Sequence, residues 1–128
     1  MTIDNRLEAT QVLVVDDDPD IRELIVIALE SEGAVTTIAE DGNQAITALH
    51  SETAELVILD MMLPHRSGFL VMEEIQAMSS PPPVIMVTAN EGRRHKAYAE
   101  SLGVSAYLNK PVPMSLLLDT AVNVLQGE

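Results

Sequence analysis

The sequence predicts an α/β protein with a doubly wound parallel sheet, a (βα)5 arrangement in which five strands alternate with five helices. Short, strongly apolar runs recur along the chain, and stretches with helical spacing of apolar residues lie between them. Apolar runs of this kind indicate strands that are covered on both faces, as in a parallel sheet. Strands that alternate with helices favour right-handed crossovers and helices on both faces of the sheet.

The predicted strands are runs rich in β-branched residues, and the run nearest the C-terminus is the weakest. They cover residues 11–15, 35–39, 56–59, 84–87 and 105–108. The segment before the first run, residues 1–10, lacks such a pattern and is expected to form a loose N-terminal extension. Because 128 residues suit one compact domain, the domain proper is predicted to cover residues 11–128.

Apolar residues with helical spacing predict the five helices. In the first helix, Asp18 is the expected N-cap and Pro19 takes the first helical position. The second helix is expected to open at Asp41, the fourth to cover about residues 92–102, and the fifth to begin at Pro113. The apolar positions expected in the core are Phe69, Met72, Ile75 and Met78 of the third helix, and Met114, Leu117, Leu118, Ala121, Val122 and Leu125 of the fifth.

The charge of the chain limits its partners. Seven basic residues against twenty acidic ones give a net charge of −13. Since phosphate binding needs a basic surface, the domain is not expected to bind nucleic acid or an anionic membrane directly. The absence of cysteine excludes disulfides and thiol catalysis. Residues 1–11 lack the apolar core of a signal peptide and no apolar run could span a bilayer, so a soluble, cytoplasmic protein is expected.

Polar side chains follow the ends of four predicted strands. They are Asp16, Asp17, Asp18, Asp60, Thr88 and Lys110. Because the carboxyl ends of parallel strands meet at the sheet edge where ligands bind, these side chains are expected to converge. Clustered carboxylates repel one another unless a cation or a proton lies between them. Oxygen ligands without histidine or cysteine favour a hard cation, and a partly hydrated Mg²⁺ fits best.

The same side chains include the parts that phosphoryl transfer requires. A carboxylate such as Asp60 can act as the nucleophile that accepts a phosphoryl group, with a metal, a hydroxyl and a lysine around it. Taken singly, each residue has a simpler interpretation: the three adjacent aspartates as helix caps, Asp60 as a turn residue, Thr88 as a packing residue and Lys110 as an exposed loop charge. Only their convergence at one edge favours the chemical interpretation.

Four segments stand in a specific order and spacing over about residues 11–126. They are Val12-Leu13-Val14-Val15-Asp16-Asp17-Asp18-Pro19, Asp60-Met61-Met62-Leu63-Pro64 with Gly68, Val87-Thr88-Ala89, and Tyr107-Leu108-Asn109-Lys110-Pro111. In these segments the chain resembles the receiver domain of two-component response regulators, the CheY-like family. The resemblance implies a flavodoxin-like strand order, 2-1-3-4-5, and a cis peptide bond between Lys110 and Pro111.

The resemblance also implies a function for the cluster of aspartates. Asp60 would accept a phosphoryl group from the phosphohistidine of a histidine kinase or a phosphotransfer protein. Mg²⁺ would be bound by Asp17 directly, by Asp16 mostly through water, by Asp60, and by the backbone carbonyl of Met62. Lys110 would pair with Asp60 and then with the phosphoryl group. Beyond this transfer and autodephosphorylation, the chain is not expected to be an enzyme.

A conformational switch is implied by the same resemblance. Thr88 would bond a phosphoryl oxygen, Tyr107 would swing inward, and the face formed by the fourth helix, fifth strand and fifth helix would bind an output partner or a second copy. Leu116 and Val124 lie off the apolar stripe of the fifth helix and are expected to share an outward face there. The basic run of residues 93–96 opens the fourth helix, and a solvated helix face is its simplest interpretation.

Two other classes of protein are alternatives. A haloacid-dehalogenase-type phosphohydrolase would use Asp16-Asp17-Asp18 as its nucleophile motif, but Pro19-Asp20 lacks the usual Thr and the chain is short for that fold. A protein-interaction module that works without phosphorylation would keep the same scaffold. The second alternative is disfavoured because none of the expected phosphorylation residues is missing. Val112, where relatives often have Phe, and His65-Arg66-Ser67 are the departures from the family pattern.

Overall fold

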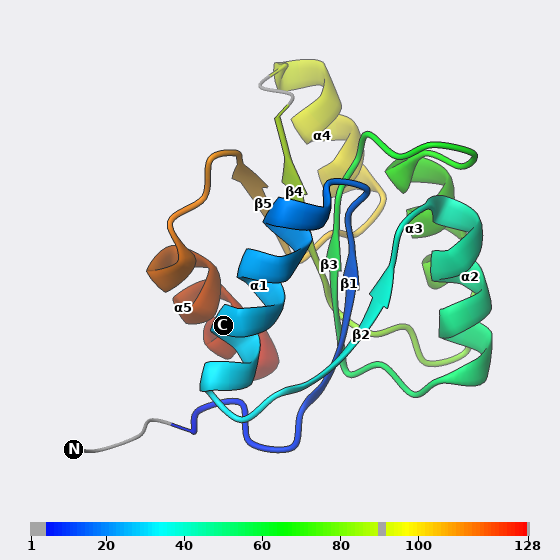
Figure 1. Ribbon diagram of the computed structural model, residues 1–128. Helices are drawn as coiled ribbons and strands as arrows, with labels where there is room; N and C mark the ends of the chain where they lie inside the picture. The colour runs from blue at the N-terminus through cyan, green and yellow to red at the C-terminus, as the bar shows by residue number, and fades with distance from the viewer. Residues whose placement is uncertain (1–4, 90–91, 128) are drawn as a thin grey trace.

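A computed structural model describes residues 5–89 and 92–127 of the chain. Five parallel strands form one sheet in the order β2-β1-β3-β4-β5, and helices follow each strand (Figure 1). The strands are β1 (Gln11–Val15), β2 (Val35–Ala39), β3 (Leu56–Leu59), β4 (Val84–Thr88) and β5 (Ala106–Asn109). The predicted fold class and strand order are confirmed; β4 extends one residue further than predicted, and β5 begins and ends one residue later than predicted.

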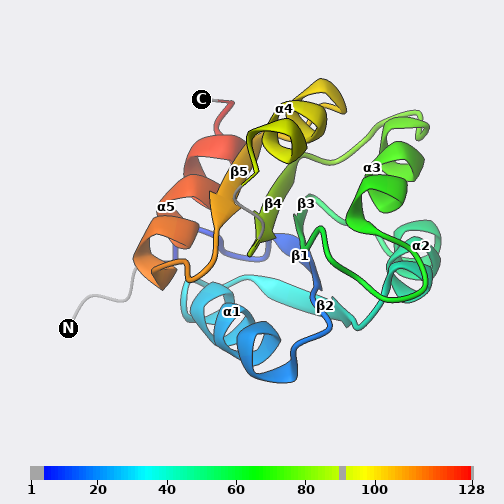
Figure 2. The ribbon, with the colours of Figure 1, turned by 90° about the horizontal axis from the view of Figure 1, so that it is seen from above.

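Helices cover both faces of the sheet. In the view from above, α1 (Pro19–Ser31) and α5 (Met114–Leu125) lie on one face (Figure 2). The other face carries α2 (Gly42–Ser51), α3 (Gly68–Gln76) and α4 (Arg93–Ser101). None of the helices in the described ranges is both long enough and apolar enough to cross a membrane.

Two apolar cores lie on the two faces because successive residues of a strand point in opposite directions. Val12, Val14 and Ile58 belong to the core under α1 and α5. Leu13 and Leu59 belong to the core under α2, α3 and α4. Burial on both faces explains why the central strands β1, β3 and β4 are nearly continuous apolar runs, whereas the edge strands β2 and β5 are partly exposed.

The register of the sheet brings the ends of the strands to the same level. Val15 of β1 is paired with Ala39 of β2 on one side and with Leu59 of β3 on the other. The next residues of β1 and β3 are Asp16 and Asp60. Two carboxylates therefore leave neighbouring strands at the same edge of the sheet.

Helix boundaries agree with the capping residues. The Asp18 side chain accepts hydrogen bonds from Asp20 N (2.9 Å) and Ile21 N (3.3 Å) at the start of α1. Asp41 caps α2 in the same way, and Pro113 precedes α5. Met78 was predicted to lie in the third helix, and this is wrong because α3 ends at Gln76. Met78 still packs on the core, but from the loop that follows the helix.

The apolar stripe of α5 is also corrected at its C-terminal end. Leu125 was expected in the core but is 36% exposed at the last residue of the helix. Val124 was expected on an outward face with Leu116, but it is partly buried against the core under α1 and α5. Leu116 is 47% exposed, as expected for its side of the helix.

The N-terminal segment, residues 5–10, packs against the domain, so the expectation of a loose extension is wrong for these residues. The Leu7 side chain is 1% exposed and belongs to the core under α1 and α5. Its backbone N–H donates to the carbonyl of Glu32 at 3.0 Å. Arg6 bonds the Glu32 carboxylate after α1 (3.1 Å) and Asp119 of α5 (2.9 Å). Residues 1–4 lie outside the described residues.

Candidate functional site

Asp16 and Asp60 are fixed by the backbone of the sheet at its carboxyl-terminal edge. The N–H of Asp16 donates to the carbonyl of Ala39 at 3.2 Å, and the N–H of Asp60 donates to the carbonyl of Val15 at 3.0 Å. Both side chains are buried, with 2% and 5% of the residue exposed. Parallel strands that end side by side thus place two carboxylates in a region poor in water.

Asp17 completes a cluster of three carboxylates. One oxygen from each of Asp16, Asp17 and Asp60 lies within 4.8 Å of the others, and only Asp17 is exposed. Like charges at this separation are unfavourable without a cation. The donor set consists of carboxylate oxygens only, which fits a hard divalent cation such as Mg²⁺ with water in its remaining positions. Asp18, in contrast, caps α1 and is not part of the cluster.

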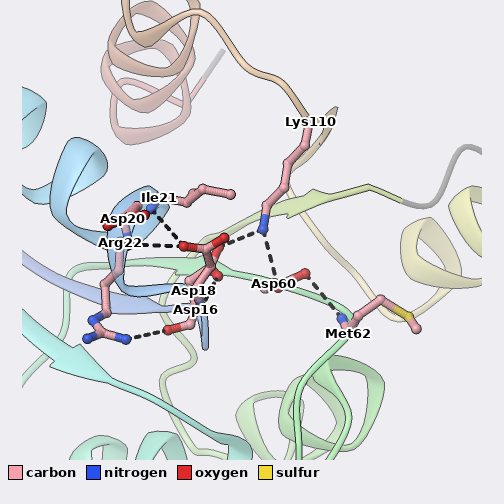
Figure 3. A network of polar contacts seen from close by, with 8 residues as sticks. All are labelled: Asp16, Asp18, Asp20, Ile21, Arg22, Asp60, Met62 and Lys110. Atoms are coloured by element: carbon pink, nitrogen blue, oxygen red, sulfur yellow. Dashed lines mark hydrogen bonds and ion pairs between the residues drawn. The ribbon is translucent and has the colours of Figure 1, made fainter.

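Lys110 supplies a positive charge to two of these carboxylates (Figure 3). Its Nζ lies 2.8 Å from Asp16 Oδ2 and 3.3 Å from Asp60 Oδ2. Burial lowers the pKa of Lys110, but the hydrogen bond to Asp16 and the charge of Asp60 outweigh burial, so the pKa is raised and the ammonium stays charged. The Lys110–Pro111 peptide is cis, as the family resemblance implied.

The two oxygens of Asp60 have different partners. Oδ1 accepts a hydrogen bond from Met62 N at 3.1 Å, and Oδ2 is paired with Lys110. Burial raises the pKa of Asp60, and the negative charge of Asp16 acts in the same direction. The charge of Lys110 and the N–H of Met62 oppose this shift without cancelling it. The carboxylate is therefore held firmly in a place where its charge is costly.

The loop after β3 depends on a glycine. Gly68 N donates to the carbonyl of Met61 at 2.8 Å. A Cβ at Gly68 would lie 2.7 Å from Cα of Met61, which is closer than real contacts allow. Glycine therefore lets the loop fold back against the residues next to Asp60. The Met62 side chain is 61% exposed, and its N–H is the group that the structure places at Asp60.

Thr88 and Tyr107 lie on the neighbouring strands β4 and β5. Thr88 is fully buried at the end of β4, and its carbonyl accepts a hydrogen bond from Lys110 N at 2.9 Å. Tyr107 is paired in register with Met86 of β4. Partial burial raises the pKa of the Tyr107 phenol. The backbone of Thr88 thus contacts Lys110 directly, whereas Tyr107 lies on the next strand, two residues before the end of β5.

One basic residue at the site was missed by the sequence analysis. Nη1 of Arg22 donates to the backbone carbonyl of Asp16 at 2.9 Å. Its Nη2 lies 3.5 Å from Oε1 of Glu40. Arginine side chains are mostly exposed, and the helical spacing of Arg22 from Ile25 and Leu29 does not predict a backbone acceptor for its guanidinium.

Comparison with known proteins agrees with this geometry. The family model of the response regulator receiver domain matches residues 12–122. A 14.6 kDa protein of Leptolyngbya boryana is 34% identical over 114 residues, which cover 87% of each chain. The DNA-binding response regulator MtrA of Mycolicibacterium smegmatis is 38% identical over 101 residues, 79% of this chain and 44% of MtrA. The chain thus spans less than half the length of that relative.

Solved structures give the same result. A CheY-like receiver domain protein from Methanospirillum hungatei superposes with a TM-score of 0.89 at 27% identity, covering 94% of this chain and 96% of that one. The receiver domain of the Francisella response regulator 1452 superposes with a TM-score of 0.84 at 29% identity, covering 92% and 97%. By sequence and by structure, this chain belongs to the response regulator receiver domain family of two-component signal transduction.

Proposed function

We propose that Asp60 accepts a phosphoryl group from the phosphohistidine of a histidine kinase or a phosphotransfer protein. One observation carries this proposal: the buried Asp60 carboxylate ends β3 with its two oxygens held by Met62 N and Lys110 Nζ, beside Asp16 and Asp17. The domain proposed for this role covers residues 11–128, of which the family model matches residues 12–122, and Leu7 of the preceding segment packs into its core.

The transfer exchanges one bond to phosphorus for another. An oxygen of Asp60 attacks the phosphorus atom, the P–N bond to the imidazole breaks, and its electron pair stays on the nitrogen, which takes up a proton. Asp60 attacks as the carboxylate, and the Lys110 ammonium at 3.3 Å keeps it in place beforehand. Lys110 then pairs with an oxygen of the acyl phosphate, and the hydroxyl of Thr88 bonds another.

The carboxylates fit the divalent cation that such a transfer uses. Asp16, Asp17 and Asp60 would hold Mg²⁺ together with the backbone carbonyl of Met62 and water. When bound, Mg²⁺ neutralises charge on the phosphoryl oxygens. Asp16 and Asp60 share the ammonium of Lys110, so the protein itself provides only part of the positive charge that the cluster needs.

We further propose that phosphorylation changes the face formed by α4, β5 and α5, which binds an output partner or a second copy. Thr88 and Tyr107 would link the site to this face, because Thr88 is buried next to Lys110 and Tyr107 is on β5. Leu116 offers an exposed apolar side chain there. Asp119, also on α5, is paired with Arg6 at 2.9 Å. No observation on this chain favours the phosphohydrolase or the phosphorylation-independent interaction module.

Intact mass spectrometry tests the acceptor. The protein treated with acetyl phosphate and Mg²⁺ is expected to gain the mass of one phosphoryl group, and Asp60→Asn is expected to gain none. A chelator should prevent the gain in the unaltered chain. Modification that persists in Asp60→Asn, or that ignores the chelator, would contradict the assignment of Asp60 and the need for Mg²⁺.

Nuclear magnetic resonance tests the switch. Beryllofluoride, which mimics the phosphoryl group, is expected to shift amide signals around both Asp60 and Tyr107. Thr88→Ala should still accept the phosphoryl group but lose the shifts near Tyr107. If the shifts in the unaltered protein stop at the residues around Asp60, no switch runs through Tyr107.

Sedimentation velocity tests the output face. We expect beryllofluoride to strengthen self-association, and Leu116→Glu to weaken it without reducing phosphorylation of Asp60. A monomer at every concentration would leave docking of a different partner as the function of this face. A dimer that Leu116→Glu does not change would place the interface elsewhere.

A further inference from the structure

Arg22 connects the turn that carries Asp16 and Asp17 to two other parts of the chain. Its side chain is only 12% exposed although it lies in the first turn of α1. Nη1 donates to the carbonyl oxygen of Asp16 at 2.9 Å, and Nη2 lies 3.5 Å from Glu40 Oε1 just after β2. In Figure 3, Arg22 and Lys110 approach Asp16 from opposite sides.

The carbonyl held by Arg22 belongs to the peptide that joins Asp16 to Asp17. The Asp16 side chain is fixed independently, since its Oδ1 accepts from Asp18 N at 2.9 Å and its Oδ2 is paired with Lys110. Asp17 is different: within the described part of the chain, no hydrogen bond or ion pair holds its exposed carboxylate. The direction of Asp17 therefore depends on the orientation of the peptide before it.

We propose that Arg22 is a positioning residue for Asp17, which acts by fixing the Asp16–Asp17 peptide so that the Asp17 carboxylate is directed at the divalent cation. The inference rests on the proposed function only in assuming that the three carboxylates bind Mg²⁺. Groups that orient metal ligands without touching the metal commonly alter metal affinity by about 10- to 100-fold when they are removed.

The chemistry of arginine suits this role. The planar guanidinium directs two N–H groups at two acceptors on different elements, whereas a lysine ammonium is a compact charge on a flexible stem. Glu40 is held in turn, because its backbone N–H donates to Oε1 of Gln44 on α2 at 2.9 Å. The Glu40 side chain is 59% exposed, so its ion pair with Arg22 contributes less than the bond to Asp16.

The test is a Mg²⁺ titration of the full chain without a phosphodonor. Binding is monitored through the nuclear magnetic resonance signals of the amides around Asp17 and Asp60. The variants are Arg22→Met, which keeps the aliphatic stem, and Arg22→Lys, which keeps the charge. Arg6→Met is the matched control, because Arg6 also bonds two partners but lies at the opposite edge of the sheet. Thermal unfolding in a chelator measures the stability of each variant.

We expect Arg22→Met to raise the Kd for Mg²⁺ about tenfold, by the usual effect of removing a group that orients a metal ligand. Arg22→Lys should restore part of the affinity, and Glu40→Gln should change it less than Arg22→Met does. Arg6→Met should lower the Tm yet leave the Kd for Mg²⁺ unchanged.

Three results would overturn the inference. If the unaltered protein binds Mg²⁺ and Arg22→Met binds it equally well with a lower Tm, Arg22 only stabilises the fold and the proposed function stands. If the unaltered protein does not bind Mg²⁺, the metal site and the inference fail together. Should Arg22→Met not fold, Arg22→Lys decides, because unchanged affinity in that folded variant also contradicts a positioning role.

Discussion

The two edges of the sheet handle charge in opposite ways. At the carboxyl-terminal edge, three carboxylates lie close together, and the ammonium of Lys110 is paired with two of them, Asp16 and Asp60. At the amino-terminal edge, the Glu32 carboxylate accepts hydrogen bonds from both the backbone and the guanidinium of Arg6, and Leu7 fills the space beside it. One edge leaves negative charge for a ligand to neutralise, whereas the other satisfies its charge internally.

The pKa values of the two edges reflect this contrast. Burial raises the pKa of Asp60, so the charged form of this carboxylate is less stable in the folded domain than in water. The hydrogen bonds to Asp119 and Glu32 raise the pKa of Arg6, so its charged form is favoured by folding. The two shifts indicate that folding disfavours the charge of Asp60 at the carboxyl-terminal edge and favours the charge of Arg6 at the amino-terminal edge.

The largest expected effect on stability is at the amino-terminal edge. Leu7→Ala should lower the free energy of unfolding by about 2–5 kcal/mol, because it removes a fully buried leucine and leaves a cavity. Urea denaturation measures the loss. Phosphorylation of Asp60 in the folded fraction should be unaffected. A loss below about 1 kcal/mol would mean that residues 5–10 detach in solution and that the edge is open.

The next effect has the opposite sign and belongs to the carboxyl-terminal edge. In a chelator at neutral pH, Asp60→Asn should raise the free energy of unfolding, because it removes a buried negative charge that faces Asp16. A folded-state pKa above the unfolded one means that the unaltered domain gains stability as the pH falls from the folded pKa to the unfolded pKa. The advantage of Asp60→Asn should therefore disappear in acid.

Thermal unfolding of both proteins from neutral to acidic pH checks this expectation. The control is Glu100→Gln, which removes an exposed charge from α4 far from the carboxylates in sequence. If Asp60→Asn is less stable than the unaltered protein at neutral pH, the ion pair with Lys110 outweighs the cost of burial, and the contrast between the edges is smaller than we infer.

The sheet was predictable because its information is local. The first three strands have the predicted bounds, and β1 and β3 are buried along almost all of their length, which is typical of continuous apolar runs. The expected convergence of Asp16, Asp17, Asp60 and Lys110 followed from topology, because parallel strands end at one edge. Their roles in phosphorylation remain predictions.

The features that the sequence analysis missed depend on contacts between distant segments. Leu7 stands between Arg6 and Glu8 without a helical or strand pattern around it, so no periodicity marks it as buried, and it packs in the core under α1 and α5. Arg22 lies three residues before the buried Ile25 and its side chain is 12% exposed, but only the turn after β1 brings the Asp16 carbonyl to its guanidinium. Single residues whose environment comes from elsewhere in the chain carry no local pattern.

The smallest expected effect separates the two partners of Arg6. The Asp119 side chain is 62% exposed and the Glu32 side chain 9% exposed, although both bond the same guanidinium. Water and salt screen the Asp119 pair, so Asp119→Asn should lower the Tm slightly at low ionic strength and not at all in high salt. Glu32→Gln keeps a hydrogen-bond acceptor but loses the charge. It should lower the Tm more than Asp119→Asn does, and this decrease should depend less on the salt concentration. Equal effects of the two variants on the Tm at every salt concentration would show that α5 is bound to the N-terminal segment as tightly as α1 is. Residues 5–10 would then hold both helices equally at the amino-terminal edge.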